Sequence, residues 1–315
     1  MILLMRNALV RAATYAAAVP LVRAAAAAGA HIRGRSLVLL YHRVRPHGRA
    51  AHDVVPTVAI DTLRCHIKAL RRFADVVSLD DLVSGADPDR LRVAITFDDD
   101  DLMTVEHALP VLEASDVRAT FFLSGRALNG LDDYWWVRLE HLLATAGIAA
   151  VRTALKVGGD VADIARACEN SEVVRRLPAI TGMPPRPQLG ATEIARLSQA
   201  GMTIGFHTLE HLVLTALGPA ALTDALARGR TALEQASQQA VRYIAYPHGQ
   251  ADTRVACAAA ASGYRAGFVT GGRAVSPDVN PWLIPRWEPG SLPAAQLTAE
   301  ALLRLHARAP RGDGS

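Results

Sequence analysis

The feature that most constrains the fold is the alternation of short apolar runs with segments of helical spacing, which begins at Ser36. This alternation is typical of βα repeats around a largely parallel sheet. The predicted strands are Leu37–Tyr41, Val76–Leu79, Arg92–Phe97, Arg118–Leu123, Met202–Phe206, Val241–Tyr246, Arg265–Val269 and Leu283–Trp287. The predicted helices are Ile60–Phe73, Met103–Ser115, Thr192–Ala200 with Thr192 as its N-cap, Pro219–Gln238 and Thr253–Ser262. The pattern predicts an α/β fold of about seven strands, either a barrel or an open doubly wound sheet.

Length and composition agree with one α/β unit. The chain has 315 residues, 50% of them hydrophobic, and α/β barrels of this length commonly form a single domain. The formal charge of +4 is spread along the chain, without a basic stripe interleaved with aromatic residues. We therefore do not expect nucleic acid as a partner. The three cysteines lie far apart and form no C-x-x-C pair, so we expect them to be reduced.

Residues 1–36 form an apolar, alanine-rich segment ahead of the first predicted strand. Its longest uncharged run, Ala12–Val22, is about half of the roughly 20 residues that span a bilayer. Two interpretations stay open: an amphipathic helix that makes peripheral membrane contact through residues 1–30, or a weak export signal cleaved near Ala24–Ala26. We favour a cytoplasmic or membrane-associated location, with export as the alternative.

The alternation lapses between about residues 132 and 190, which hold the pair Trp135–Trp136 and the proline-rich stretch Met183–Pro187. We interpret this region as an insertion of helices and loops within one domain that spans residues 37–306. Residues 307–315 are expected to be a disordered tail. The two tryptophans either anchor the insertion to the core or form a platform on which a sugar ring stacks.

Four consecutive acids, Asp98–Asp101, directly follow the apolar strand Arg92–Phe97. The carboxyl ends of parallel strands form the reaction face of α/β folds. Adjacent carboxylates repel one another unless water, a cation or hydrogen bonds compensate their charge. The run is therefore either a solvated loop or a site in which one carboxylate binds a cation and another removes a proton.

A pair of histidines, His207 and His211, follows the predicted strand Met202–Phe206. Histidines at this spacing converge on a helix or in a compact turn, although such a pair also arises by chance. Two imidazoles and a carboxylate from another strand end would fit zinc with one open position, and also cobalt or another divalent transition metal.

A third motif, Tyr246-Pro247-His248-Gly249, follows the predicted strand Val241–Tyr246. Proline and glycine on either side of one residue mark a tight turn. The functional interpretation is that this turn directs the backbone N–H of His248 toward a developing oxyanion.

These motifs together resemble the polysaccharide deacetylase family, carbohydrate esterases that share the NodB homology domain. Thr96–Asp99 is similar to the family motif T-F-D-D, and His207–His211 is similar to H-[ST]-x-x-H. Ala245–Gly249 resembles a variant of the third motif, A-Y-P-x-G. Further similar segments are Leu40–Val44, Ala119–Phe122 and Leu283–Arg286. Order and spacing agree over roughly residues 37–290.

The resemblance implies a deformed (β/α) barrel and a deacetylase that removes N-acetyl groups from amino-sugar glycans. It implies that Asp99, His207 and His211 bind a divalent metal, most simply zinc. Asp98 would then be the general base that takes a proton from water. The metal and the His248 N–H would stabilise the oxyanion before acetate leaves.

The chain departs from the family pattern at three points. Asp100 and Asp101 follow the first motif, where the family usually has glycine. Either their charge acts on the site, or their side chains point outward. Ala245 replaces the arginine found in many third motifs, so Arg286 either orients the base or forms a surface ion pair. The final histidine of the family, its usual general acid, has no clear match; His42, at the end of the first strand, is preferred over His306.

Two other functions stay open. A related hydrolase of a different amide or ester would need the same centre, because such a centre contacts only a carbonyl group and water. A non-catalytic glycan-binding relative would fit the altered third motif. Retention of both the Asp-Asp pair and the His-His pair favours an enzyme.

Overall fold

The structure, a computed structural model, describes residues 34–85, 91–131, 133–168, 171–177 and 188–307. Its centre is a parallel sheet with the strand order β1-β5-β6-β7-β8-β9-β10. These strands are β1 (Ser36–Tyr41), β5 (Arg92–Asp98), β6 (Thr120–Leu123), β7 (Thr203–Phe206), β8 (Tyr243–Ala245), β9 (Ala266–Thr270) and β10 (Ile284–Arg286). A short strand, β4 (Asp75–Val76), pairs with the first residues of β5.

Trp287, the residue after β10, joins the last strand to the first. Its backbone N–H donates to the carbonyl of Val38 at 2.8 Å, and the Leu40 N–H donates to the Trp287 carbonyl at 2.8 Å. The seven strands of this path therefore form a nearly closed barrel. This confirms the predicted deformed (β/α) barrel and excludes the open doubly wound sheet.

Side chains alternate between the barrel interior and the surrounding helices, as the period of two in a strand requires. On β5, Val93, Ile95 and Phe97 pack outward in the main hydrophobic cluster, whereas Ala94 packs in a second cluster inside the barrel. Asp98 has the same parity as Ala94, so the strand itself turns this carboxylate into the barrel mouth.

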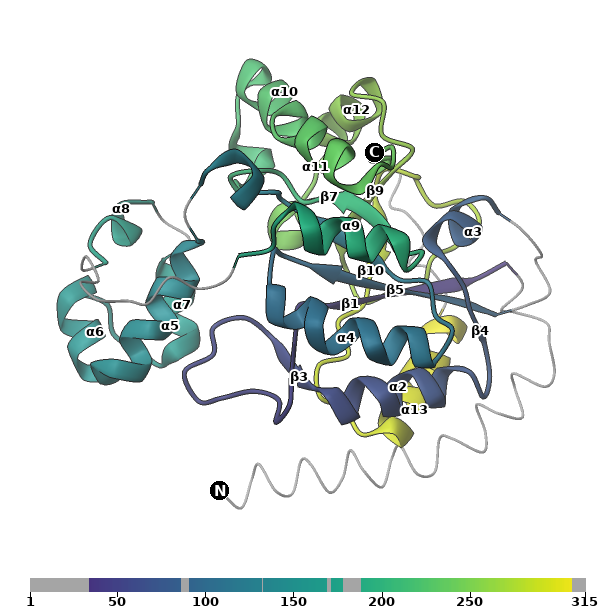
Figure 1. The fold of residues 1–315 in the computed structure, drawn as a ribbon, viewed down its shortest axis with the longest axis horizontal. Helices are drawn as coiled ribbons and strands as arrows, with labels where there is room; N and C mark the ends of the chain where they lie inside the picture. Colours follow the sequence, from purple (N-terminus) through teal and green to yellow (C-terminus); the bar gives the residue numbers. More distant parts are fainter. Residues whose placement is uncertain (1–33, 86–90, 132, 169–170, 178–187, 308–315) are drawn as a thin grey trace.

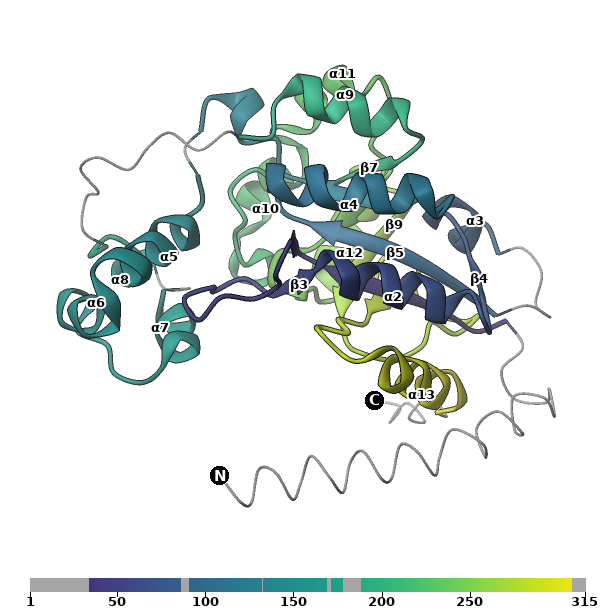
Figure 2. The ribbon, with the colours of Figure 1, turned by 60° about the horizontal axis from the view of Figure 1, so that its bottom comes forward.

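Helices cover the outside of the barrel (Figures 1 and 2). α2 (Ile60–Leu70) lies between α4 (Leu102–Ala114) and α13 (Ala294–His306). The remaining helices of this layer are α3 (Leu79–Val83), α9 (Ala191–Gln199), α10 (Pro219–Ala227), α11 (Arg230–Ser237) and α12 (Thr253–Ala261). Their buried faces are mainly leucine, valine and alanine, as expected from a sequence poor in aromatics.

One predicted helix is two helices. The segment Pro219–Gln238 is divided because Gly229 has φ +91°, a left-handed conformation that ends α10 before α11 begins. A Cβ at Gly229 would also lie 3.3 Å from the side chain of Leu209. The prediction of one continuous helix missed this break, since the leucine and alanine spacing continues across it.

Several element boundaries differ from the prediction, two of them at helix N-caps. The strand predicted over Val76–Leu79 ends at Val76, and the Ser78 hydroxyl accepts the Asp81 N–H at 3.1 Å as the N-cap of α3. The N-cap of α9 is Gly190, not Thr192, and Glu193 accepts the Gly190 N–H at 3.0 Å.

The predicted insertion contains α5 (Trp135–Thr145), α6 (Gly147–Leu155), α7 (Val161–Ala167) and α8 (Ser171–Val174). These helices stand beside the barrel and have their own hydrophobic cluster (Figure 1). The proline-rich stretch 183–187, residues 1–33 and the tail from 308 onward lie outside the described residues. Within the described part of the chain, no helix has the length and apolar character needed to cross a membrane.

A buried carboxylate, Glu140 of α5, connects the insertion to the barrel. It pairs with Arg43 on β2 (Arg43–Arg45) at 2.6 Å and also accepts the Val54 and Val55 N–H groups at 2.7 and 3.2 Å. The side chains of Arg43 and Glu140 are 6% and 8% exposed. β2 pairs with β3 (Thr57–Ala59) in a small parallel ribbon that the sequence analysis missed because each strand is only three residues long.

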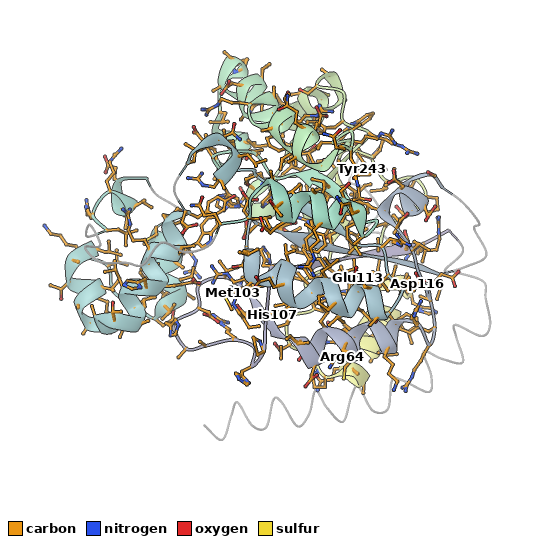
Figure 3. All side chains as sticks on the ribbon, in the orientation of Figure 1. Arg64, Met103, His107, Glu113, Asp116 and Tyr243 are labelled. Carbon is orange, nitrogen blue, oxygen red and sulfur yellow. The ribbon has the colours of Figure 1, made fainter. Side chains whose placement is uncertain are left out.

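The insertion lies at the end of the barrel where the strands finish. Figure 3 places Met103, in the first turn of α4, toward the insertion, and Asp116 and Tyr243 toward the opposite end. Because α4 follows β5 directly, the carboxyl end of β5 faces the insertion. The acids and histidines that follow the strands therefore lie between the barrel mouth and the insertion.

The buried pair predicts that Glu140→Ala lowers the free energy of unfolding by about 3–5 kcal/mol, because it leaves the Arg43 guanidinium buried without a counter-charge. Urea unfolding of both proteins measures this difference. Glu172→Ala is the control in the same insertion, because Glu172 and its partner Arg175 are each 71% exposed. That change should cost about 0–1 kcal/mol. Equal effects of the two substitutions would contradict the proposed connection.

Candidate active site

A cleft of about 420 Å³ opens at the carboxyl ends of the strands. Its polar lining residues are His42, Asp98, Asp99, His207, His211, His248, Thr270, Arg286 and Glu288. The structure therefore brings together all seven site residues named from the sequence, although they come from five separate strand ends. Its apolar lining comes mainly from the β2–β3 loop and the insertion, through Val54, Val55, Pro56, Trp135, Trp136 and Ala165.

Asp98 and Arg286 form a buried two-point ion pair inside the barrel mouth. Both guanidinium NH groups donate to the Asp98 carboxylate at 2.6 Å, and the side chains are 3% and 1% exposed. Burial raises the pKa of Asp98, but the charge of Arg286 and its hydrogen bonds outweigh this effect, so that the net pKa is lowered. Asp98 is therefore ionised at neutral pH, and Arg286 is not part of a surface ion pair.

Asp99, His207 and His211 form a compact cluster beside this pair. Asp99 Oδ1 lies 3.8 Å from His207 Nε2 and 3.9 Å from His211 Nε2, and the three atoms lie within 4.8 Å of one another. Ligands on a tetrahedral ion with bonds of about 2.0–2.1 Å are separated by roughly 3.4 Å. Two of the separations, 3.8 and 3.9 Å, are somewhat wider than this value, and the third is no more than 4.8 Å.

The chemistry of the cluster fits a divalent cation. Asp99 Oδ1 is buried and has no hydrogen-bond partner among the described residues. Burial and the adjacent Asp98 raise the pKa of Asp99, whereas burial and the neighbouring histidines lower the pKa of His211 well below its usual value. His211 is therefore neutral, with a lone pair available, next to a carboxylate oxygen that accepts no hydrogen bond from the described residues. A cation held between them would satisfy both groups.

The orientation of His207 is fixed by the strand next to it. Its Nδ1 lies 2.8 Å from the carbonyl of Ala245, so that Nδ1 carries the hydrogen and Nε2 faces the carboxylates. The backbone carbonyl of Ala245 thus determines which nitrogen of His207 faces the carboxylates. The histidines converge through a non-helical turn in which Thr208 and His211 have φ +56° and +54°.

Asp100 and Asp101 do not point outward. Asp100 accepts the N–H groups of Ser124 and Arg126 at 2.7 and 3.0 Å. Asp101 is the N-cap of α4 and binds Arg45 through two hydrogen bonds of 2.7 and 2.8 Å. Despite burial, the hydrogen bonds and charge of Arg45 lower the pKa of Asp101 to about 2. Both acids hold loops around the site.

His42 lies at the end of β1 and pairs with Glu288, two residues after Arg286. Its Nδ1 is 3.0 Å from Glu288 Oε1. Burial lowers the pKa of His42, but the hydrogen bond to Glu288 and the surrounding carboxylates raise it more, so that the net pKa is raised. Glu288 was not predicted from the sequence, although the alternation of a strand places it on the same side as Arg286.

His306, the alternative to His42, is outside the cleft. It ends α13, and its Nδ1 lies 2.7 Å from the Leu302 carbonyl one turn earlier in that helix. The histidine at the strand end is thus in the cleft, and the histidine near the C-terminus is not.

His248 lies in a three-residue turn, Pro247–Gly249, that follows β8. Its φ is +59°, and its ring centroid is 4.7 Å from that of His211. Gly249 has φ +66°, and a Cβ there would lie 2.1 Å from the Thr270 hydroxyl, so only glycine fits. The turn places His248 against the histidine cluster.

The tryptophan pair lines the cleft and also packs between the insertion and the histidine cluster. Trp136 is 6% exposed and packs edge-on against His211, with ring centroids 5.0 Å apart. Trp135 is half-buried and packs edge-on against Trp136 at 5.5 Å. Both line the cleft, and Trp135 also packs against the hydrophobic cluster of the insertion.

Fold and site together define a hydrolase built on a deformed α/β barrel. The chain belongs to the polysaccharide deacetylase family, whose sequence pattern matches residues 85–267, more than half of the chain. No curated protein sequence matches the chain at a significant level.

Solved structures with the same fold are known at low sequence identity. The Streptococcus pyogenes deacetylase PplD in complex with acetate is 17% identical, with a TM-score of 0.60, covering 85% of this chain and 98% of that one. IcaB from Ammonifex degensii is 18% identical, with a TM-score of 0.58 and coverages of 87% and 97%. A polysaccharide deacetylase from Bacillus cereus is 16% identical, with a TM-score of 0.55 and coverages of 85% and 69%.

The ion pair predicts a pH effect for Arg286→Lys. Lysine cannot make the two-point contact, so the pKa of Asp98 rises while its burial stays the same. If ionised Asp98 is the base, the acidic limb of kcat/KM moves to higher pH. The pH profile on an N-acetylated glycan measures this shift.

Arg45→Lys is the matched control, because Arg45 also binds a carboxylate through two hydrogen bonds but does not line the cleft. The acidic limb of kcat/KM in Arg45→Lys should lie at the same pH as in the wild type. An unchanged acidic limb in Arg286→Lys would refute the stated role of the ion pair.

Proposed function

We propose that the chain is a divalent-metal-dependent deacetylase that removes N-acetyl groups from polysaccharides or oligosaccharides of the N-acetylglucosamine type. One observation carries this proposal: a buried carboxylate paired with an arginine lies beside a largely buried Asp–His–His cluster in one cleft. His207 Nε2 is 3.8 Å from Asp98 Oδ2 and also 3.8 Å from Asp99 Oδ1. A base and a cation site could thus both contact one acetamide group of a substrate.

Asp99, His207 and His211 would hold the metal, with zinc favoured and cobalt or another transition metal as alternatives. A bound divalent cation would polarise the acetamide carbonyl and make a water molecule more acidic. Asp98 would accept a proton from the water molecule. The oxygen of that water would bond to the carbonyl carbon at the same time. Arg286 keeps this carboxylate ionised and fixes its orientation.

His42 is the residue that we assign as the general acid. When the C–N bond breaks, the amino group of the sugar must gain a proton before it leaves, and His42 lines the same cleft. Its contact with Glu288 favours the protonated imidazole that this step needs. We further assign to the His248 backbone N–H a hydrogen bond to the developing oxyanion. The products are acetate and a free amine.

The apolar lining supports a sugar substrate. Trp135 and the β2–β3 residues 54–56 face the polar groups across the cleft. Aromatic and aliphatic surfaces of this kind pack against the apolar face of a sugar ring, while the acids and histidines contact its acetamide. That one of the similar structures is a deacetylase in complex with acetate agrees with this assignment.

The main alternative is a hydrolase that acts on another amide or ester, because the polar groups would contact only a carbonyl and water. A non-catalytic glycan-binding relative is less well supported. It would have no use for an ionised Asp98, its arginine and the His42–Glu288 pair in the same cleft as the histidine cluster.

We predict that Asp98→Asn lowers acetate release from N-acetylglucosamine oligomers by about 10²–10⁴-fold, because an amide cannot accept the proton. Release is measured after removal of metal and after addition of zinc or cobalt. The wild type should need the metal, and the variant should still bind it. Release that is independent of metal would contradict the proposed centre. Absence of release with metal binding intact would favour the other amide or ester.

A second prediction concerns the acid. His42→Asn should lower kcat by about 10²–10⁴-fold with little change in KM, because the leaving amine then lacks a proton donor. Glu288→Gln should lower the pKa of His42, and the basic limb of the kcat profile should then move to lower pH. A His42→Asn variant with wild-type kcat would exclude His42 as the acid.

A further inference from the structure

The turn that carries the two histidines is strained. Thr208 and His211 both have positive φ, and for a β-branched residue such as threonine this conformation is rarely occupied. Residues in such conformations persist only where surrounding contacts fix them. The turn that positions His207 and His211 therefore needs support from outside itself.

Arg126 provides such support from the loop that follows β6. Its guanidinium donates to the carbonyl of Leu209, in the middle of the strained turn, at 2.9 Å. Its backbone N–H donates to Asp100 at 3.0 Å, directly after the Asp98–Asp99 pair. One residue thus connects the acid-bearing strand end to the histidine-bearing turn.

Arg126 also begins a series of contacts between aromatic rings that ends at His211. Its guanidinium lies 4.6 Å from the ring centroid of Tyr134. Tyr134 stacks on Trp136 with centroids 4.0 Å apart and an interplanar angle of 12°. Trp136 meets the His211 ring edge-on at 5.0 Å. The backbone of the turn and the imidazole of His211 are therefore fixed from the same side.

We infer that Arg126 is a positioning residue for the Asp99–His207–His211 cluster. It holds the Leu209 carbonyl and, through Tyr134 and Trp136, the ring of His211, so that the two histidines face Asp99 before a cation binds. This inference rests on the metal centre of the proposed function. Loss of such a contact around a metal ligand typically lowers metal affinity by about 10–100-fold.

The chain contains a matched control, Arg230. Its guanidinium donates to the Ser262 carbonyl at 2.9 Å and lies 4.5 Å from the ring centroid of Tyr264. Arg126 makes two contacts of the same kind, one to a backbone carbonyl and one to a tyrosine ring. Both arginines are half-buried. The partners of Arg230, which include Glu234, do not line the cleft.

The experiment compares the full-length wild type with Arg126→Met, Arg126→Lys and Arg230→Met. The affinity for zinc and for cobalt is measured by competition with a chromophoric chelator, and the metal-free proteins are unfolded in urea. We expect Arg126→Met to bind either metal 10–100-fold more weakly. Arg126→Lys, which keeps the charge and a donor, should recover part of the affinity. Arg230→Met should bind as the wild type does, although its urea midpoint falls as well.

Each outcome has one meaning. Wild-type affinity in Arg126→Met, or an equal loss in both methionine variants, overturns the positioning role and leaves the proposed function intact. A wild type that binds neither metal removes the metal centre and this inference with it. If Arg126→Met does not fold, the lysine variant decides: weaker metal binding in a folded metal-free protein supports the inference, and unchanged binding overturns it.

Discussion

The contact between Asp98 and Arg286 is the interaction on which the rest of the site depends. Inside the barrel mouth neither charge is solvated, so each is tolerated only because the other lies 2.6 Å away. Arg286 is supplied by the last strand of the barrel and Asp98 by a strand next to the first. The site can therefore be assembled only when the order of strands around the barrel is correct. This pairing links the fold to the chemistry.

Much of the fold could be predicted from two patterns in the sequence, the short apolar runs of strands and the helical spacing of the segments between them. Strand β5 was predicted because five consecutive apolar or threonine residues, 93–97, precede the acids. The break at Gly229 was not predicted, because a single glycine is compatible with a helix when leucine spacing continues on both sides. The β2–β3 ribbon was missed since three residues are too few to show a period of two.

Residues that line the cleft were predicted where motifs follow strands, and missed where a partner comes from elsewhere in the chain. The sequence indicated Arg286 as a candidate to orient the base but could not decide between that function and a surface ion pair. Burial of Arg286 inside the barrel excludes the surface ion pair. Glu288, Arg126 and Glu140 were missed because their partners lie about 80 to 250 residues away along the chain. No local pattern reports contacts of this length.

The closure of the barrel by Trp287 has a consequence for the lifetime of the active state. Arg286 and Glu288 flank this residue, so the same short segment completes the barrel and supplies the partners of Asp98 and His42. Two backbone hydrogen bonds between Trp287 and β1 maintain that arrangement. A local opening of this junction would separate Asp98 and His42 from their partners in one event, while the histidine cluster after β7 stayed in place. In the proposed mechanism, such an opening would stop acetate release and leave the proposed metal ligands together.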